Sequence, residues 1–219
     1  METRELIARR AALELRHGTL VNVGIGLPTL VPRFLPEGVE VYFQSENGLI
    51  GMEPVPEQGM EDEFLTDAGG GAIGAIPGAC TLDASLSFGL IRGGHLDLSV
   101  LGGLQVDELG RLANWLVPGK MVAGMGGAMD IVTGAKRVIV AMAHTTPEGQ
   151  PRLVRRCTYP LTSLRRVDLV ITELAVIEPV EEGLVLRELA PGVSLGEVLA
   201  HTEARLIVPS AVPSMQLAA

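Results

Sequence analysis

Short runs of aliphatic residues recur along this chain, and turn-forming or amphipathic segments separate them. Apolar runs of about four to eight residues that are bounded by turn signals are typical of buried strands. On this pattern we expect strands at residues 20–23, 39–44, 96–101, 138–142, 169–174, 183–186 and 206–208. Because helical segments alternate with these runs, the pattern predicts an α/β fold with a single-domain, open, mostly parallel sheet flanked by helices, spanning residues 1–219.

Capping residues mark the helices that are expected between these strands. Thr3 can cap a first helix that Gly18 ends, and Pro28 is well placed to begin a second helix. Ser194 followed by Glu197 forms a capping-box pattern at the start of the last helix. The expected helices cover residues 3–17, a segment that begins at 28, residues 83–91 and residues 194–201.

Three segments are expected to lie outside regular structure. Residues 52–63 are rich in Pro, Gly and acidic side chains, which predicts an exposed loop. The three glycines at 69–71 predict a flexible break, and residues 75–79 are expected to lead into the third helix. We find neither an interdomain linker nor an internal repeat in the sequence.

Composition and charge exclude several classes of protein. Hydrophobic residues make up 47% of the chain, which excludes a disordered protein, and aromatic residues make up only 3%, which favours a sheet built from Val, Ile and Leu. The net charge is −9 and no Lys or Arg block stands out, so no nucleic-acid binding is expected. The densest basic stretch is interpreted as solvated loop and strand faces rather than as an anion site, and it contains Arg152, Arg155, Arg156, Arg165 and Arg166.

Cysteine and histidine patterns indicate a cytoplasmic protein without a bound metal. Cys80 and Cys157 lie far apart, follow no metal-ligand spacing and are expected to be reduced thiols. The four histidines have no ligand partner at close helical spacing, so no metal site is expected. The charged first residues form an amphipathic helix rather than a signal peptide, and no run of 18 or more apolar residues predicts a membrane span.

Glu46 is the residue that says most about chemistry. A strand rich in β-branched and aromatic residues ends just before it, and Asn47-Gly48 is a strong turn signal just after it. This order places a carboxylate at the carboxyl edge of the sheet, where α/β folds bind ligands. In a partly desolvated pocket near N–H donors, such a carboxylate can attack a thioester carbonyl. The alternative is an exposed Glu before an ordinary hairpin turn.

Glycine-rich turns can supply the N–H donors that this reaction needs. They follow strands or precede helices, and they cover residues 22–26, 102–103 and 124–130. Glycine permits a positive φ and lets the backbone approach an anion or a developing oxyanion closely. None of the turns contains a P-loop or the complete dinucleotide fingerprint, and each one taken singly is better explained as a tight turn without a ligand.

Other catalytic classes lack the residues that they require. The chain has no strand–Gly-x-Ser-x-Gly–helix elbow for a serine nucleophile, and neither cysteine lies beside an identifiable histidine or a glycine turn. His95 and His144 could act as bases, but each is better explained as a structural loop histidine. Glu46 therefore remains the best candidate for a nucleophile.

The segment Phe43–Gly51, which contains Glu46, resembles the active-site signature of the family I coenzyme A-transferases. It is most similar to that of the B (β) subunit of 3-oxoacid CoA-transferases, of the succinyl-CoA:3-ketoacid or 3-oxoadipate type. Further motifs match in order, so that the resemblance extends from about residue 3 to residue 208. These motifs are Asn22–Pro28, Ile91–Asp97, Leu112–Trp115, Pro118–Met121, Gly126–Asp130, Cys157–Thr162 and Glu188–Val193.

The resemblance implies a ping-pong reaction in which Glu46 is the nucleophile. Glu46 attacks an acyl-CoA, expected to be succinyl-CoA, and forms an acyl-glutamyl anhydride. The CoA thiolate then forms a glutamyl-CoA thioester, from which a 3-oxoacid takes the CoA. No cofactor is held permanently, because coenzyme A is itself a substrate.

The resemblance also assigns the residues around the substrate. Asn22 corresponds to a position near the substrate or thioester, and Asn47 is expected to orient the turn that carries Glu46. Residues 127–129 are implied to form a backbone oxyanion site and substrate wall. The complete set of implied substrate- and CoA-binding residues is Asn22, Gly24, Gly26, Asn47, Gly127, Ala128 and Met129.

One position departs from the family pattern, which bears on the substrate. Similar members read Ala-Gly-Lys where this chain reads Ala68-Gly69-Gly70, so a positive contact is absent or comes from elsewhere. The family also implies a partner A (α) subunit that holds much of the CoA, an active site between subunits, and a hetero-oligomer. Two alternatives stay open: an acyl-CoA hydrolase on the same scaffold, and a non-catalytic ligand-binding relative.

Overall fold

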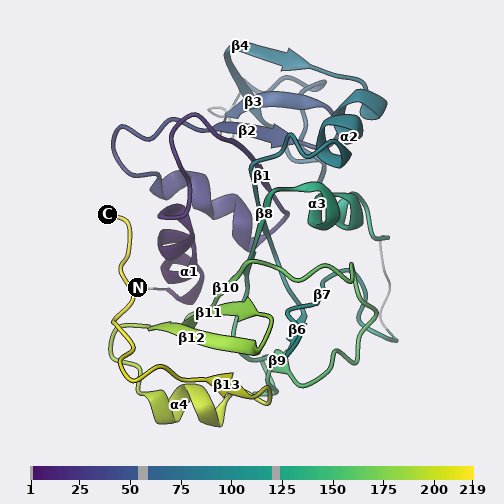
Figure 1. Cartoon of the computed structure of the whole chain (residues 1–219). Coiled ribbons are helices and arrows are strands. Elements are labelled where there is room, and N and C mark those ends of the chain that lie inside the picture. Colours follow the sequence, from purple (N-terminus) through teal and green to yellow (C-terminus); the bar gives the residue numbers. More distant parts are fainter. Residues whose placement is uncertain (1, 54–58, 120–123) are drawn as a thin grey trace.

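A ten-stranded sheet forms the centre of the protein (Figure 1). The computed structural model describes residues 2–53, 59–119 and 124–219. The five neighbouring strands from β10 to β2 are parallel, and antiparallel strands flank them on both sides. In sheet order the strands are β13 (Leu206–Ile207), β12 (Gly183–Leu189), β11 (Ala175–Val180), β10 (Leu169–Ile171), β8 (Arg137–Ala141), β5 (Leu98–Leu101), β1 (Leu20–Val23), β2 (Tyr42–Ser45), β3 (Leu49–Glu53) and β4 (Gly74–Thr81).

Helices cover both faces of the sheet, as the expected α/β architecture requires. On one face lie α1 (Thr3–Ala12) and the 3-10 helix η1 (Leu27–Phe34), and on the other lie α2 (Ala84–Arg92) and α3 (Ala128–Gly134) (Figure 1). A short helix, α4 (Leu195–Ala200), lies near β13. Among the described residues, no helix is both long and apolar enough to cross a lipid bilayer.

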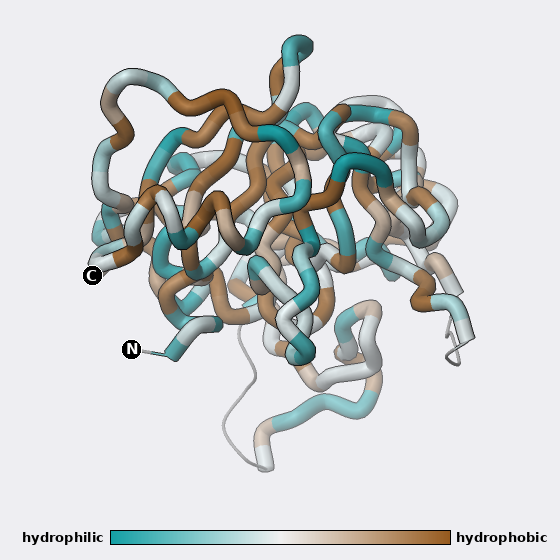
Figure 2. Tube along the Cα trace, turned by 90° about the horizontal axis from the view of Figure 1, so that it is seen from below, coloured by the Kyte–Doolittle hydropathy of each residue, from teal (hydrophilic) through white to brown (hydrophobic). Residues whose placement is uncertain are grey.

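The central strands are apolar on both sides because both sides are buried. In β8, Val138 and Val140 belong to the core on the α2–α3 face, whereas Ile139 and Ala141 belong to the core on the α1 face. Hydrophobic stretches accordingly run through the middle of the molecule, while many outer loops are hydrophilic (Figure 2). Every strand expected from the sequence falls on a strand of this sheet.

The first helix is shorter than expected and is capped differently. It ends at Ala12 instead of about residue 17, and its N-cap is Glu2, which makes no side-chain cap hydrogen bond. Thr3 is therefore the first helical residue and not the cap. Gly18 (φ 77°) is not the helix stop, and its N–H instead donates to the Glu40 carbonyl at 2.8 Å.

The structure refines two further expectations about local structure. The segment beginning at Pro28 forms a 3-10 helix, since Pro32 lies inside it and cannot donate the hydrogen bond that an α-helix needs. Residues 75–79 lie in the strand β4, which pairs with β3 and, as expected, leads directly into the helix α2 (Ala84–Arg92). Of the loop expected at 52–63, residues 52 and 53 belong to β3, residues 54–58 lie outside the described residues, and residues 59–63 are exposed.

A second, three-stranded sheet was not expected from the sequence. It consists of β7 (Leu112–Ala113), β6 (Gln105–Asp107) and β9 (Leu153–Val154). Its strands have only two or three residues each, so no alternation of polar and apolar positions marks them. The strands β3, β4 and β11 and the helix α3 were also absent from the expected set.

The basic stretch at 152–166 is only partly solvated. Arg152 donates to the Gly103 carbonyl at 3.1 Å, and Arg165 donates to carbonyls at the end of α3, including that of Val132 at 2.9 Å. Arg155 and Arg156 are exposed, as expected. Two arginines of the stretch therefore hold backbone segments in place.

Candidate active site

Glu46 follows β2 at the carboxyl edge of the parallel strands, and its side chain lines a cavity of about 580 Å³. All three glycine-rich turns singled out in the sequence meet at this cavity. The lining residues are Asn22, Gly24, Ile25, Glu46, Ala68, Leu101, Gly102, Gly103, Leu104, Asn114, Trp115, Gly124, Met125, Gly126, Gly127, Ala128 and Ile131. The structure thus brings together segments that lie more than a hundred residues apart in the chain.

The Glu46 side chain is partly buried and lies close to the Asn22 amide and to Gly127. Nδ2 of Asn22 donates a hydrogen bond to Oε2 of Glu46 at 3.0 Å. A Cβ added to Gly127 would lie 3.2 Å from Cγ of Glu46 and 3.1 Å from the ring of Phe88. Glu46 does begin the turn of the β2–β3 hairpin, but its side chain is partly buried and hydrogen-bonded and is not freely exposed.

Asn22 is held in turn by buried polar groups on neighbouring elements. It is completely buried, and its Nδ2 also lies 3.2 Å from Oε1 of Gln44. The Ser99 hydroxyl donates to Oδ1 of Asn22 at 3.3 Å, and Nε2 of Gln44 donates to the Ser87 hydroxyl at 3.0 Å. The amide that contacts Glu46 thus belongs to a network that extends from β5 to α2.

The residues on either side of Glu46 anchor a loop that forms one wall of the cavity. The Ser45 hydroxyl accepts the Ala68 N–H at 3.0 Å, and the Asn47 amide donates to the Thr66 carbonyl at 2.8 Å. Ala68 lines the cavity. The Asn47 side chain is therefore directed to this loop, and the structure shows no contact between it and the Glu46 carboxylate.

Asn114 and Trp115 line the cavity, although sequence reasoning gave them no role. The Asn114 side chain donates to the Gly102 carbonyl at 3.2 Å and accepts the Thr162 hydroxyl at 2.6 Å. Trp115 donates from its indole to the Leu161 carbonyl at 3.3 Å. The segments that contain Asn114–Trp115 and Leu161–Thr162 are thereby hydrogen-bonded to each other. Only this tertiary contact shows that they lie together.

The structure gathers most, but not all, of the site residues expected from the sequence. Asn22, Gly24, Gly127 and Ala128 line the cavity with Glu46. Three others do not line it. These are Gly26, which caps η1 with a φ of 90°, Asn47, which anchors the neighbouring loop, and Met129, which is 51% exposed on α3.

The histidines and cysteines lie outside this site. His144 is completely buried between the hydroxyls of Thr172 and Thr202, and burial lowers its pKa to about 4. Burial raises the pKa of the Cys157 thiol to about 12, so it is not a thiolate nucleophile at neutral pH. Within the described ranges, no group of three or more His, Cys, Asp or Glu residues is placed to hold a metal.

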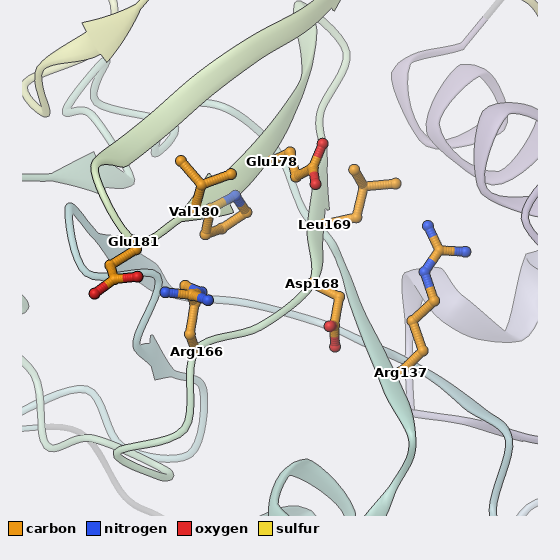
Figure 3. A pocket seen from close by; sticks show the side chains of 8 residues that line it. Arg137, Arg166, Asp168, Leu169, Glu178, Val180 and Glu181 are labelled. Carbon is orange, nitrogen blue, oxygen red and sulfur yellow. The ribbon is translucent and has the colours of Figure 1, made fainter.

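A second hollow lies at the opposite edge of the sheet (Figure 3). Arg137 and Leu169, the first residues of β8 and β10, line it, so it lies at the amino ends of the parallel strands. Figure 3 shows Arg137 and Arg166 on either side of Asp168. Three of its charges are paired with residues outside the hollow: Arg137 with Glu14 at 2.6 Å, Asp168 with Arg165 at 3.2 Å and Glu178 with Arg187 at 2.5 Å.

The chain is similar in sequence to subunits of known CoA-transferases. The chain is 52% identical over 208 residues to the β subunit of acetate CoA-transferase from Escherichia coli K12, and the matched region covers 95% of each of the two chains. It is 48% identical over 205 residues to the B (β) subunit of succinyl-CoA:3-ketoacid coenzyme A transferase from Helicobacter pylori 26695, covering 94% of this chain and 99% of that one.

A solved structure shows the same fold within a longer chain. The apoenzyme of the acyl-CoA transferase YdiF from Escherichia coli O157:H7 matches with a TM-score of 0.79 and 26% identity. The match covers 98% of this chain but only 43% of the YdiF chain. The coenzyme A transferase family profile matches residues 4–201, and we conclude that this chain belongs to the coenzyme A transferase family.

Proposed function

We propose that this chain is the B (β) subunit of a two-subunit CoA-transferase and that Glu46 is its nucleophile. In this proposal the enzyme moves coenzyme A from an acyl-CoA donor, succinyl-CoA, to a 3-oxoacid acceptor. The observation that carries the proposal is the position of Glu46: a partly buried carboxylate on the wall of a cavity of about 580 Å³, with the Asn22 amide 3.0 Å from one of its oxygens.

The first half-reaction requires an attack by the carboxylate on the thioester. An oxygen of Glu46 bonds to the thioester carbonyl carbon, the C–S bond breaks, and the CoA thiolate leaves an acyl-glutamyl anhydride. The thiolate then attacks the glutamyl carbonyl carbon and displaces the acyl carboxylate, which leaves a glutamyl-CoA thioester. The acceptor carboxylate then attacks the glutamyl-CoA thioester and displaces the CoA thiolate, which leaves an anhydride between the acceptor and Glu46. The thiolate attacks the acyl carbonyl of this anhydride, which gives the new acyl-CoA and free Glu46.

The residues around Glu46 suit this chemistry. The Asn22 N–H group faces Oε2 and can stabilise the negative charge that develops on a glutamyl oxygen. We assign Gly127 and Ala128, in the glycine-rich turn beside Glu46, to the backbone donors for the substrate oxyanion. All the covalent steps use Glu46 and the two substrates, so this reaction requires no resident cofactor. A CoA thioester complex of YdiF, with a TM-score of 0.75 and 25% identity to this chain, supports a covalent CoA intermediate.

The proposal includes an A-type partner subunit. The relatives are named as β or B subunits, and the YdiF chain is more than twice as long as its match to this chain. Large apolar side chains are exposed at and near the cavity, including Ile25 at 70% and Met129 at 51%. We propose that the partner covers this edge, binds part of the CoA and keeps water from the intermediates, in a cytoplasmic hetero-oligomer.

One observation favours a second candidate for the acceptor. The identity to the acetate CoA-transferase β subunit, 52%, exceeds the identity to the 3-ketoacid enzyme, 48%. Acetate is therefore the alternative acceptor to a 3-oxoacid. A panel of acetate, acetoacetate and 3-oxoadipate, tested with succinyl-CoA and the partner subunit, separates the two by the ratio of their kcat/KM values.

Replacement of Glu46 tests the proposed nucleophile. With the partner present, the parent enzyme incubated with acyl-CoA is expected to form an adduct on Glu46 that hydroxylamine or borohydride traps and mass spectrometry locates. Glu46→Gln is expected to abolish both the adduct and turnover. Glu46→Asp is expected to lose about 100-fold or more in turnover, because the shorter side chain misplaces the attack by about 1 Å.

Glu40→Gln is the matched control, since Glu40 is an exposed glutamate that precedes the same strand. It is expected to keep full turnover. Retained transfer by Glu46→Gln would rule out the proposed mechanism. Rapid thioester loss without any acceptor acid would instead indicate a hydrolase.

A further inference from the structure

A row of buried polar side chains crosses three adjacent parallel strands directly below Glu46. Asn22 of β1 is in register with Gln44 of β2 on one side and with Ser99 of β5 on the other. Asn22 and Ser99 are completely buried, and Gln44 is 2% exposed. Apart from Ser45 at the end of β2, they are the only buried polar residues of these three strands, whose other buried residues are Val, Leu and Phe.

The row faces the α2–α3 side of the sheet, and α2 closes it. Val21 and Phe43 belong to the core on the α1 side, so their neighbours in the strands point to the opposite face. There the Gln44 amide donates to the hydroxyl of Ser87, a completely buried residue of α2. The row therefore links β5, β1 and β2 to one helix.

The partners along the row set the direction in which the Asn22 amide points. Glu46 Oε2 and the Gln44 backbone carbonyl, at 3.3 Å, can only accept, so they require the NH₂ group of Asn22 on their side. The oxygen of Asn22 then faces Ser99, which donates to it. The Gln44 side-chain oxygen also accepts from Asn22, so the NH₂ group of Gln44 faces Ser87.

Such a row is unfavourable unless each member has its partner. Buried polar groups are costly to desolvate, and Val or Leu at these positions would match the surrounding sheet. Every side-chain amide in the row is satisfied, and the row ends at the oxygen of Glu46. The hydrogen bonds therefore offset the free-energy cost of burying these polar side chains, and the last of them holds the Glu46 carboxylate in a fixed position.

We propose that Gln44, Ser99 and Ser87 are positioning residues that act on Glu46 through Asn22. They hold the Asn22 NH₂ group toward Oε2 and so keep the carboxylate in one orientation, against Gly127 and facing the cavity. None of the three is among the residues that line the cavity. This inference rests on the proposed function, because it takes Glu46 as the group that attacks the thioester.

Single-turnover kinetics with the chain and its partner subunit test the inference. The rate constant of adduct formation at saturating acyl-CoA reports the attack, and its concentration dependence reports binding of the acyl-CoA. Ser99→Ala and Gln44→Met are expected to slow adduct formation by about 10- to 100-fold, because a small misplacement of a reacting group has effects of this size. The apparent Kd is expected to stay within about twofold, since none of these residues contacts the cavity.

A double-mutant cycle separates positioning from a general loss of structure. In an Asn22→Ala background, Gln44→Met and Ser99→Ala are expected to slow the reaction little further, because their effect passes through Asn22. Thr172→Val is the matched control: Thr172 is also completely buried and hydrogen-bonded, but to His144 and away from the cavity. It is expected to lower the thermal midpoint and leave the rate constant unchanged.

The outcomes distinguish this inference from the proposed function. If the parent enzyme forms no adduct on Glu46, the proposed function fails and the positioning role fails with it. If the parent forms the adduct and the folded Ser99→Ala and Ser87→Ala variants react at the parent rate, only the positioning role is overturned. The positioning role is also overturned if, in the double mutant, the rate loss of Asn22→Ala and the rate loss of the second substitution multiply fully. Since Ser87→Ala and Ser99→Ala only remove an oxygen, they carry the test if Gln44→Met does not fold.

Discussion

At the scale of single residues, the candidate site depends on how closely Gly127 approaches Glu46. An added Cβ at Gly127 would meet Glu46 Cγ at 3.2 Å and the Phe88 ring at 3.1 Å, which is tighter than ordinary van der Waals contact. The carboxylate also accepts a hydrogen bond from Asn22, so a shift of the Glu46 side chain disturbs that hydrogen bond. Glycine at this position thus leaves the space that the Glu46 side chain occupies.

Gly127→Ala is therefore expected to lower kcat by about 10- to 100-fold, because it displaces the reacting group by a few tenths of an ångström or turns it. Steady-state kinetics of the assembled enzyme measure the effect. Gly89→Ala is the control, since Gly89 lies on the exposed side of α2 with nothing within 4 Å of an added Cβ. It is expected to keep kcat and to gain about 0.5–1 kcal/mol of stability. Equal kcat values for the two variants would contradict the steric argument.

At the scale of elements, α2 connects the surface of the protein to Glu46. Its N-cap Asp83 accepts the Leu86 N–H at 2.9 Å, and the next turn carries Ser87 to Gln44 and Phe88 to Gly127. At its far end Arg92 pairs with Asp130 of α3 at 2.7 Å. A change at the start of this helix therefore reaches the site through two side chains.

Asp83→Ala is expected to reduce the free energy of unfolding by about 1 kcal/mol and turnover by a few-fold. Urea denaturation and steady-state assays measure the two effects. Ser194 caps α4 through its hydroxyl and the Glu197 N–H at 3.2 Å, and no residue of α4 lines the cavity. Ser194→Ala is expected to give a similar loss of stability with unchanged turnover. A similar change of turnover in both variants would show that α2 has no special link to Glu46.

At the scale of the whole molecule, His144 makes stability depend on pH. Burial, and to a lesser extent the charge of His201, lowers the pKa of His144 in the folded protein to about 4, whereas an unfolded histidine has a pKa near 6.5. Between these values the unfolded chain binds a proton that the folded chain does not. This contribution to stability is therefore complete above about pH 6.5 and is lost as the pH falls toward 4, by about 1.4 kcal/mol per pH unit.

His144→Gln is expected to be less stable than the parent at pH 7.5, because it disturbs the contacts with Thr172 and Thr202. Between pH 6.5 and 4 its free energy of unfolding is expected to fall less steeply than that of the parent. The difference between the two slopes is expected to be about 1.4 kcal/mol per pH unit. Urea denaturation at several pH values measures both slopes. Identical slopes for the parent and His144→Gln would contradict the assignment.

The sequence by itself determined the α/β class, the central strands and the place of Glu46. The strands β1, β5, β8 and β10 are buried on both faces, so each leaves a local run of apolar residues that needs no knowledge of its neighbours. Glu46 could be located because a strand and an Asn-Gly turn flank it directly. The resemblance to a known family pointed to Asn22 and to residues 127–129.

Tertiary structure alone decided which segments meet at Glu46. Strands of two or three residues such as β7 and β9 have no period of their own and depend on pairing partners far along the chain. A possible signal was present in the polar residues at 22, 44 and 99 within apolar strands, but their contact depends on the register of β1, β2 and β5. Asn114 and Trp115 lie at the cavity with hydrogen bonds to Thr162 and Leu161, which are distant in the sequence. Register and packing are long-range properties, so local sequence patterns could not specify them.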